Sequence, residues 1–120
     1  MAWWEWDVAT GLINMHERKA TMLGYTFGEF PKQMYDICKL IHPDDYERVM
    51  QAMRDHLTGK SKPYDVVYRI KEKKGSYKWY YDKGGIVEND INGKPSKLIG
   101  LVVDVTEMTE LQNKINREKL

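Results

Sequence analysis

The longest run of apolar positions lies near the C-terminus. Residues 98–103 carry no polar side chain and are rich in branched residues, which predicts a buried strand. Asp104 and Thr106 follow directly, and either side chain can accept hydrogen bonds from free backbone N–H groups at a helix start. Glu107 sits three residues after Asp104, the spacing of a capping box. The pattern predicts a strand that runs straight into a helix over residues 106–120, with apolar positions at helical spacing: Met108, Leu111 and Ile115.

Alternation of apolar and polar positions predicts further strands. In residues 64–71, Tyr64, Val66, Tyr68 and Ile70 share one face, and polar residues dominate the other. Gly84 and Gly85 predict a bulge or bend within a long strand. Clusters of turn residues separate the segments. The five expected strands cover residues 3–8, 12–16, 64–71, 77–87 and 98–103.

Helical segments are expected in the middle of the chain. The clearest starts at His42, because Pro43 is favoured at the first helical position and the acids Asp44 and Asp45 suit the first turn. Its apolar residues fall on one face: Tyr46, Val49, Met50, Met53 and Leu57. Shorter helices are expected at residues 17–23 and 33–40, and a short turn of helix at residues 26–31.

This order of elements predicts an α+β fold. Two strands precede the helices, and three antiparallel strands and an exit helix follow them. Helices in such an order cover one face of an antiparallel sheet. The length of 120 residues suits a single domain.

Charge and cysteine content exclude several classes of function. Nineteen basic and 18 acidic residues leave a formal net charge of +1, so we expect no nucleic-acid partner. A single cysteine, Cys38, excludes an internal disulfide and a cysteine-rich zinc site. No stretch has the length of a membrane span, and the first residues do not read as a signal peptide. We expect a cytoplasmic fragment without membrane contact, whose parent protein could still be membrane-anchored.

Seven short segments resemble the PAS domain, with its C-terminal PAC portion, of bacterial and archaeal sensor kinases. They occur in the family's order and span nearly the whole chain. The segments are Trp4-Glu5-Trp6-Asp7 with Thr10-Gly11, Leu23-Gly24-Tyr25, Ile41-His42-Pro43-Asp44-Asp45, Tyr68-Arg69-Ile70, Lys74-Gly75-Ser76 before Trp79, Gly93-Lys94-Pro95 before Leu98-Ile99-Gly100, and Asp104-Val105-Thr106-Glu107.

The resemblance implies a five-stranded antiparallel sheet in the order 2-1-5-4-3, with short helices that enclose a cavity on one face. It places a PAS domain with its PAC portion at residues 1–106 and the start of a signalling helix at residues 107–120. It implies a non-catalytic sensory module, often dimeric, that contacts other domains of a larger protein. A histidine kinase is the expected parent; a diguanylate cyclase, a transcription regulator, or a structural dimerisation or spacer role without ligand are the alternatives.

The resemblance also assigns a signal relay to the end of the last strand. Asp104, Val105 and Thr106 match the family's Asp-Ile-Thr element, which couples that strand to the output helix. Arg69 is the expected ion-pair partner of Asp104. Both Asp104 and Thr106 could act only as helix caps, worth about 1 kcal/mol each; we expect relay and capping together. The apolar positions of the following helix fill less than two heptads, so we expect weak or absent dimerisation through it.

A small-molecule pocket is expected between the sheet and residues 33–57. Methionines are plentiful there and fill irregular space, although simple core packing is the alternative for each one. Tyrosines, and Trp79, could add polar tips or stacking faces. The candidate pocket residues are Met15, Met22, Met34, Ile37, Cys38, Ile41, Met50, Met53, Tyr68 and Tyr81.

The cofactor stays unknown, and neither flavin nor haem is expected. Cys38 lies near the flavin-reactive cysteine of light-sensing PAS relatives, but the flanking residues differ from their motif, so a buried structural thiol is expected. His56 falls at the edge of the apolar stripe on the helix that haem-binding relatives use. No histidine pair has metal-ligand spacing with a carboxylate, and no catalytic residues are predicted.

Residues 98–103 also have a second apolar face. If Leu98, Gly100 and Val102 point one way, then Ile99, Leu101 and Val103 point the other. Together with Trp3 or Trp4 this face would form an exposed patch, and large apolar patches mark interfaces. We expect self-association or domain packing through it.

Overall fold

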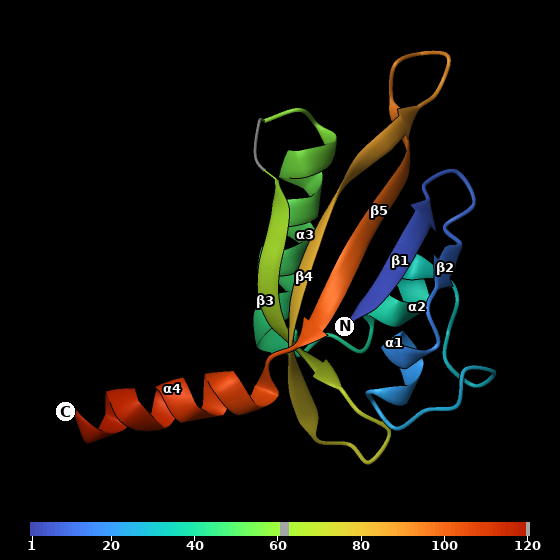
Figure 1. Ribbon diagram of the computed structural model, residues 1–120. Helices are drawn as coiled ribbons and strands as arrows, with labels where there is room; N and C mark the ends of the chain where they lie inside the picture. Colours follow the sequence, from blue (N-terminus) through green and yellow to red (C-terminus); the bar gives the residue numbers. More distant parts are fainter. Residues whose placement is uncertain (61–62, 120) are drawn as a thin grey trace.

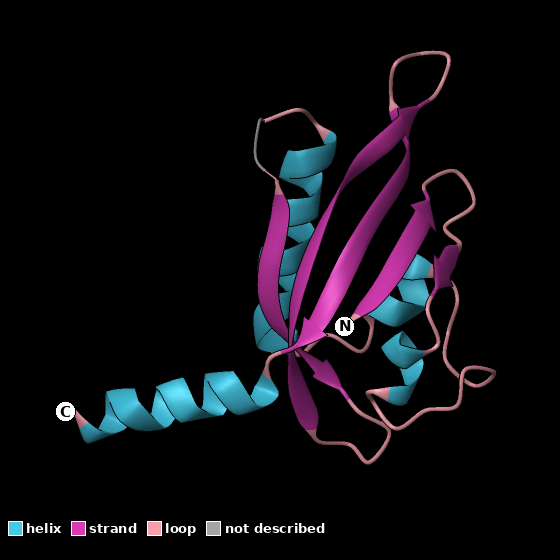
Figure 2. Ribbon diagram, viewed as in Figure 1, coloured by secondary structure: helices cyan, strands magenta, loops and turns pink. Residues whose placement is uncertain are grey.

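A computed structural model describes residues 1–60 and 63–119 of the chain. Five strands form one antiparallel sheet in the order β2-β1-β5-β4-β3 (Figure 1). Three helices cover one face of it, and a fourth projects away from the body (Figure 2). The α+β fold, the strand order and the exit helix are confirmed. The elements are β1 (Ala2–Asp7), β2 (Ile13–Met15), α1 (Arg18–Thr21), α2 (Met34–Cys38), α3 (Pro43–Leu57), β3 (Tyr64–Lys71), β4 (Tyr77–Asn89), β5 (Pro95–Asp104) and α4 (Thr106–Glu118).

The last strand, β5, lies in the middle of the sheet. It pairs with β1 on one side and with β4 on the other. Leu98 and Val102 are fully buried on its inward face, whereas Ile99 and Leu101 are about half exposed on the outward face. The expected alternation of the two faces is therefore confirmed, and β5 leads directly into α4.

Two glycines on neighbouring strands make room for one tryptophan. Gly84 of β4 pairs with Gly100 of β5, and Gly100 pairs with Trp4 of β1. A Cβ atom would lie 2.6 Å from the Trp4 ring at Gly84 and 2.2 Å from it at Gly100. The bulge predicted at Gly84 and Gly85 is wrong, because the register breaks only beyond Ile86. Position 84 requires glycine because the indole ring of Trp4 lies against its backbone.

An ion pair fixes the start of α3 to β3. His42 caps the helix, since its Nδ1 accepts from the Asp44 backbone N–H at 3.1 Å. Asp45 is buried and accepts three hydrogen bonds from Arg69: from the backbone N–H and Nε at 2.8 and 3.0 Å, and from Nη2 at 2.8 Å. The Arg69 guanidinium lowers the pKa of Asp45 to about 2. Sequence reasoning explained Asp45 by the helix dipole alone and missed this pair.

Residues 27–29 form a single turn, in which the Phe30 backbone N–H donates to the Thr26 carbonyl oxygen at 3.2 Å, and no helix is assigned there. Thr26 and Glu29 do exchange the two hydrogen bonds of a capping box, at 2.7 and 3.3 Å. Pro31 follows too soon for a helix to extend beyond that box. Phe30 is instead buried, and Lys32 Nζ donates to its carbonyl oxygen at 2.6 Å.

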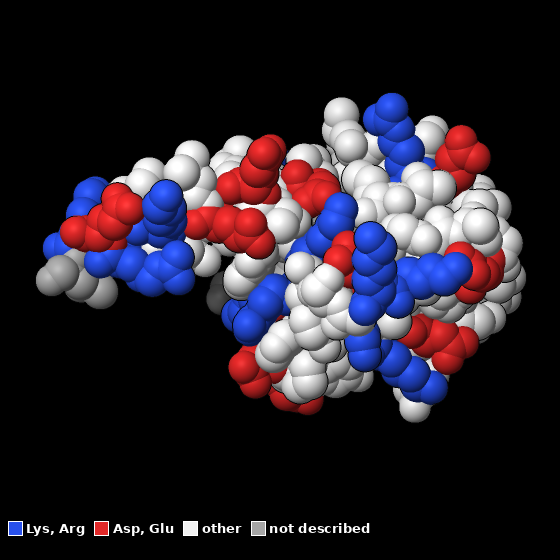
Figure 3. Space-filling model, turned by 90° about the horizontal axis from the view of Figure 1, so that it is seen from below, with Lys and Arg blue, Asp and Glu red and all other residues white. Residues whose placement is uncertain are grey.

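Charges of both signs are interspersed on the face seen in Figure 3. On α4, Glu107 lies in the first turn and Arg117 in the last, as the helix dipole favours. Within the described ranges, none of the helices combines the length and apolar character that a membrane crossing requires.

We predict that Asp45→Asn lowers the free energy of unfolding at pH 7 by about 2 kcal/mol. The pKa of Asp45 falls from 3.8 to about 2 on folding. The stabilisation is therefore complete above pH 3.8 and is lost as the pH falls toward 2. Urea unfolding at a series of pH values measures it.

Asp44→Asn is the matched control, because Asp44 lies in the same helical turn but is exposed. Its expected loss is below 1 kcal/mol. Equal losses for the two variants at pH 7 would contradict a specific role for the Asp45–Arg69 pair.

Candidate ligand-binding cavity and signal junction

A cavity of about 400 Å³ lies between the inward face of the sheet and the helices. This volume falls in the range of small-molecule sites. Tyr35 of α2, 71% exposed, and Tyr46 of α3, 36% exposed, both line the cavity, so it reaches the surface between these helices. The apolar part of its wall is Trp4, Trp6, Ile13, Met34, Ile37, Cys38, Ile41, Val49, Met50, Met53 and Ile70.

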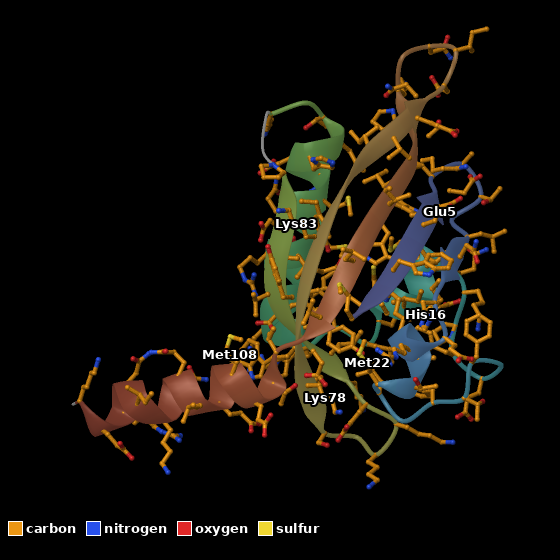
Figure 4. All side chains as sticks on the ribbon, viewed as in Figure 1. Glu5, His16, Met22, Lys78, Lys83 and Met108 are labelled. Atoms are coloured by element: carbon orange, nitrogen blue, oxygen red, sulfur yellow. The ribbon has the colours of Figure 1, made fainter. Side chains whose placement is uncertain are left out.

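Most of the sequence-predicted pocket residues lie in this wall: Met34, Ile37, Cys38, Ile41, Met50, Met53 and Tyr68. Three do not. Met15 is buried in the core on β2, and Met22 is half-buried at the end of α1, where Figure 4 labels it. Tyr81 lies on the outward face of β4 and donates to Asp65 Oδ2 at 3.0 Å. Trp79 is on the same outward face, under the Arg69 guanidinium.

A buried carboxylate forms the polar floor of the cavity. Asp82 of β4 is only 6% exposed. Trp4 Nε1 donates to its Oδ1 at 2.7 Å, and the Tyr68 hydroxyl donates to its Oδ2 at 3.0 Å. Sequence reasoning missed Asp82. The signal was its position two residues after Tyr80, which places both side chains on the inward face of β4.

A buried lysine faces the same cavity from α1. Lys19 is 5% exposed, and its ammonium lies 5.7 Å from the centre of the Phe30 ring. Burial lowers the pKa of Lys19, and the nearby Asp82 carboxylate partly opposes this shift. Burial raises the pKa of Asp82, opposed first by Lys19 and then by the donors Trp4 and Tyr68. The two groups therefore stabilise each other's charge across an otherwise apolar space.

Cys38 lies in the wall as a protonated thiol. Burial raises its pKa to about 11, although the charge of Lys19 opposes the shift. Its Sγ lies 3.5 Å from Met34 Sδ. A thiol with a raised pKa is a poor nucleophile and a poor metal ligand at neutral pH. Within the described residues, no three His, Cys, Asp or Glu side chains come close enough to bind a metal ion.

The junction between β5 and α4 is held by side-chain and backbone hydrogen bonds to β4. Asp104 Oδ1 accepts from the Thr106 backbone N–H at 3.0 Å and from its hydroxyl at 2.6 Å. The Thr106 oxygen in turn accepts from the Trp79 backbone N–H at 2.9 Å, and the Val105 N–H donates to the Trp79 carbonyl at 2.9 Å. The first turn of α4 is thus tied to β4 as well as to β5.

The ion pair expected between Arg69 and Asp104 is wrong. Asp104 instead pairs with Lys78, at 3.4 Å, beside the point at which α4 leaves the sheet (Figure 4). Strand β4 separates β5 from β3, so Arg69 turns to Asp45. Burial raises the pKa of Asp104, but the Thr106 hydrogen bonds and the Lys78 charge outweigh it and hold the pKa below its usual value.

The capping box expected between Asp104 and Glu107 does not form. Val105 occupies the N-cap position of α4, and within the part of the chain that the structure describes no side chain accepts a capping hydrogen bond there. Asp104 lies one residue earlier and accepts the N–H of the first helical residue instead.

We predict that Asp82→Leu lowers the free energy of unfolding by roughly 3–5 kcal/mol. The variant leaves Trp4 Nε1 and the Tyr68 hydroxyl without their acceptor and Lys19 without its counter-charge. Asp65→Leu is the matched control, because Asp65 also accepts from a tyrosine hydroxyl but on the surface, and should cost about 1 kcal/mol or less. Urea unfolding measures the loss of unfolding free energy in both variants. Equal losses would refute the role of Asp82.

Comparisons with known proteins agree with this geometry. A family model described as the PAS fold matches residues 12–102. The two-component sensor PprA of Pseudomonas aeruginosa is 35% identical over 72 residues, which cover 59% of this chain and 7% of that protein. Hybrid signal transduction histidine kinase A of Dictyostelium discoideum is 26% identical over 81 residues, which cover 66% of this chain and 4% of that protein. The chain therefore spans less than a tenth of these curated relatives.

A solved structure extends the likeness over nearly the whole chain. The sensory box histidine kinase/response regulator from Burkholderia thailandensis superimposes with a TM-score of 0.83 at 29% identity. The alignment covers 98% of this chain and 88% of that one. Because the family model matches well over half of the sequence, and the strand order and helical cover agree with it, the chain belongs to the PAS family.

Proposed function

We propose that this chain is a sensory PAS module of a larger signalling protein, with a histidine kinase as the expected parent. In this proposal a small molecule binds in the cavity, and the last strand relays the change through Asp104 and Thr106 into α4. The module itself carries out no catalysis, and it acts in the cytoplasm. The relatives that are named sensor or histidine kinase support this choice of parent.

One observation carries the proposal: the cavity and the exit helix are joined by the centre of the sheet. The cavity floor is Asp82 of β4, and β4 pairs with β5 next to it. Tyr80, two residues before Asp82, lies opposite Asp104. A ligand that shifts β4 and β5 therefore acts on the residues that hold α4. Such a ligand must bind two arrangements of the module with different affinities.

A second surface supports association with another copy or domain. Trp3, Ile99 and Leu101 are each 40–50% exposed on the outward face of β1 and β5. Trp4, the alternative considered for this patch, is buried. We propose this outward face as the dimer or domain contact. The apolar residues of α4, Met108, Leu111 and Ile115, are also exposed.

We predict that a ligand from a metabolite library raises the thermal midpoint of the wild-type protein by several degrees. At one hundred times its dissociation constant, a ligand adds about 2.7 kcal/mol of stability. Val49→Phe should abolish the shift, because Val49 lines the cavity and a larger ring fills it. Val67→Phe should keep it, because Val67 lies on the outward face of β3.

A library without a single stabilising compound would favour the alternative of a structural spacer. A shift that persists in Val49→Phe would place the ligand outside the cavity.

We predict that Asp104→Ala uncouples ligand binding from output in the full-length parent protein. Ligand affinity should stay within threefold of wild type, whereas the ligand-dependent change in output, autophosphorylation for a kinase, should be lost. Removal of the hydrogen bonds to Thr106 should also cost about 1 kcal/mol of stability.

Asp90→Ala is the control, because Asp90 accepts the backbone N–H of Asn92 two residues later, as Asp104 accepts that of Thr106, but in the turn between β4 and β5. An unchanged response in Asp104→Ala, with the small loss of stability, would show that Asp104 is only a structural contact at the helix start.

A further inference from the structure

Lys19 lines the cavity, and its ammonium group finds no hydrogen-bond acceptor among residues 1–60 and 63–119. Lys19 as a residue is only 5% exposed. The ammonium lies over the face of the Phe30 ring, 5.7 Å from its centre. A lysine ammonium carries three donors, and a buried charge without acceptors is costly. The group is therefore placed to receive an acceptor from within the cavity.

Asp82 does not fill this role. Its Oδ1 already accepts from Trp4 and its Oδ2 from Tyr68. Within the described part of the chain it makes no direct ion pair with Lys19, and the two charges act on each other only through space.

A second donor in the wall is also unpaired. Trp6 follows Trp4 by two residues on β1, and its Nε1 is buried without an acceptor in the part of the chain that the structure describes. A buried N–H without an acceptor is costly. Unpaired donors therefore belong to both α1 and β1, and much of the remaining wall is apolar and adaptable, with Met34, Met50 and Met53.

We infer that the cavity takes a small amphipathic carboxylic acid, whose carboxylate binds the Lys19 ammonium and whose apolar body lies against the methionines. The inference rests on the proposed ligand-binding function and names the ligand class. A carboxylate supplies the acceptors that Lys19 lacks, in a charge-assisted hydrogen bond. An alcohol of the same length supplies a weaker acceptor, and an amine would place a second cation beside Lys19.

Three probes of equal length test the inference: octanoate, 1-octanol and octylamine. Calorimetric titration at pH 7 should show octanoate binding at least tenfold more tightly than 1-octanol, with no binding of octylamine. Lys19→Met should reduce octanoate affinity at least tenfold, to the level of 1-octanol, and leave 1-octanol binding within threefold. Lys83→Met is the control, because Lys83 is an exposed lysine beside the outward apolar residues Ile99 and Leu101 (Figure 4).

The location of the probe is measured on the wild-type protein, so that it does not depend on the folding of a variant. Amide chemical shifts in 15N-labelled protein should change most at Met34 and Ile37 on addition of octanoate, because both residues line the cavity, and less at Ile99 and Leu101, whose side chains lie on the opposite face of the sheet. Lys19→Arg, which keeps the charge, should retain at least a third of the octanoate affinity.

Separate outcomes would overturn the inference and the proposed function. Equal affinity for octanoate and 1-octanol, preference for octylamine, or shifts confined to Ile99 and Leu101 would overturn the carboxylic acid alone. Absence of binding by all three probes would also overturn it. The proposed function fails only if the wider metabolite library gives no cavity ligand either.

Discussion

The burial of one carboxylate organises the centre of this domain. A carboxylate without partners in a protein interior costs several kcal/mol, so the chain must bring donors and counter-charge to Asp82. They come from three other elements: Trp4 from β1, Tyr68 from β3 and Lys19 from α1. The indole of Trp4 reaches Asp82 only by lying against the bare backbone of Gly84 and Gly100. One buried polar group thus accounts for Trp4, Tyr68 and the two glycines on the sheet's inward face.

The helical layer is held at its edges, which leaves the cavity open beneath it. At one edge, Asp45 binds Arg69 and the His42 N–H donates to the Arg69 carbonyl at 2.9 Å. At another, Lys73 of the β3–β4 turn binds Glu29 at 2.9 Å. These contacts fix the cover without requiring side chains to fill the space between the helices and the sheet. Flexible methionines line that space, and they can repack around a ligand.

Local sequence patterns predicted the elements, and the family resemblance predicted their order in the sheet. Period-two alternation in residues 64–71 and helical spacing in residues 43–57 each depend on neighbours along the chain, so they can be read without a fold. The partners of Asp82, Asp45 and Arg69 depend on strand register across the sheet, which alternation does not contain. Hence the Arg69–Asp104 pair was wrong, and Asp82 was missed. Tyr81 was misplaced for the same reason: the sequence does not show which alternate residues of β4 point inward, and these are Tyr80 and Asp82.

The same register places the cavity and the exit helix within a few residues of each other. Trp79, Tyr80 and Asp82 follow one another on β4: Asp82 is the cavity floor, and the backbone of Trp79 holds Val105 and Thr106. A strand in a paired sheet transmits a displacement along its length more readily than a loop does, because its hydrogen bonds keep successive residues in fixed relation. Lys78 and Asp104 add a salt bridge across the same end of β4 and β5. Rearrangement around Asp82 would therefore reach α4 through β4 as well as through β5. The size of the response is limited by the difference in ligand affinity between the two arrangements of the module.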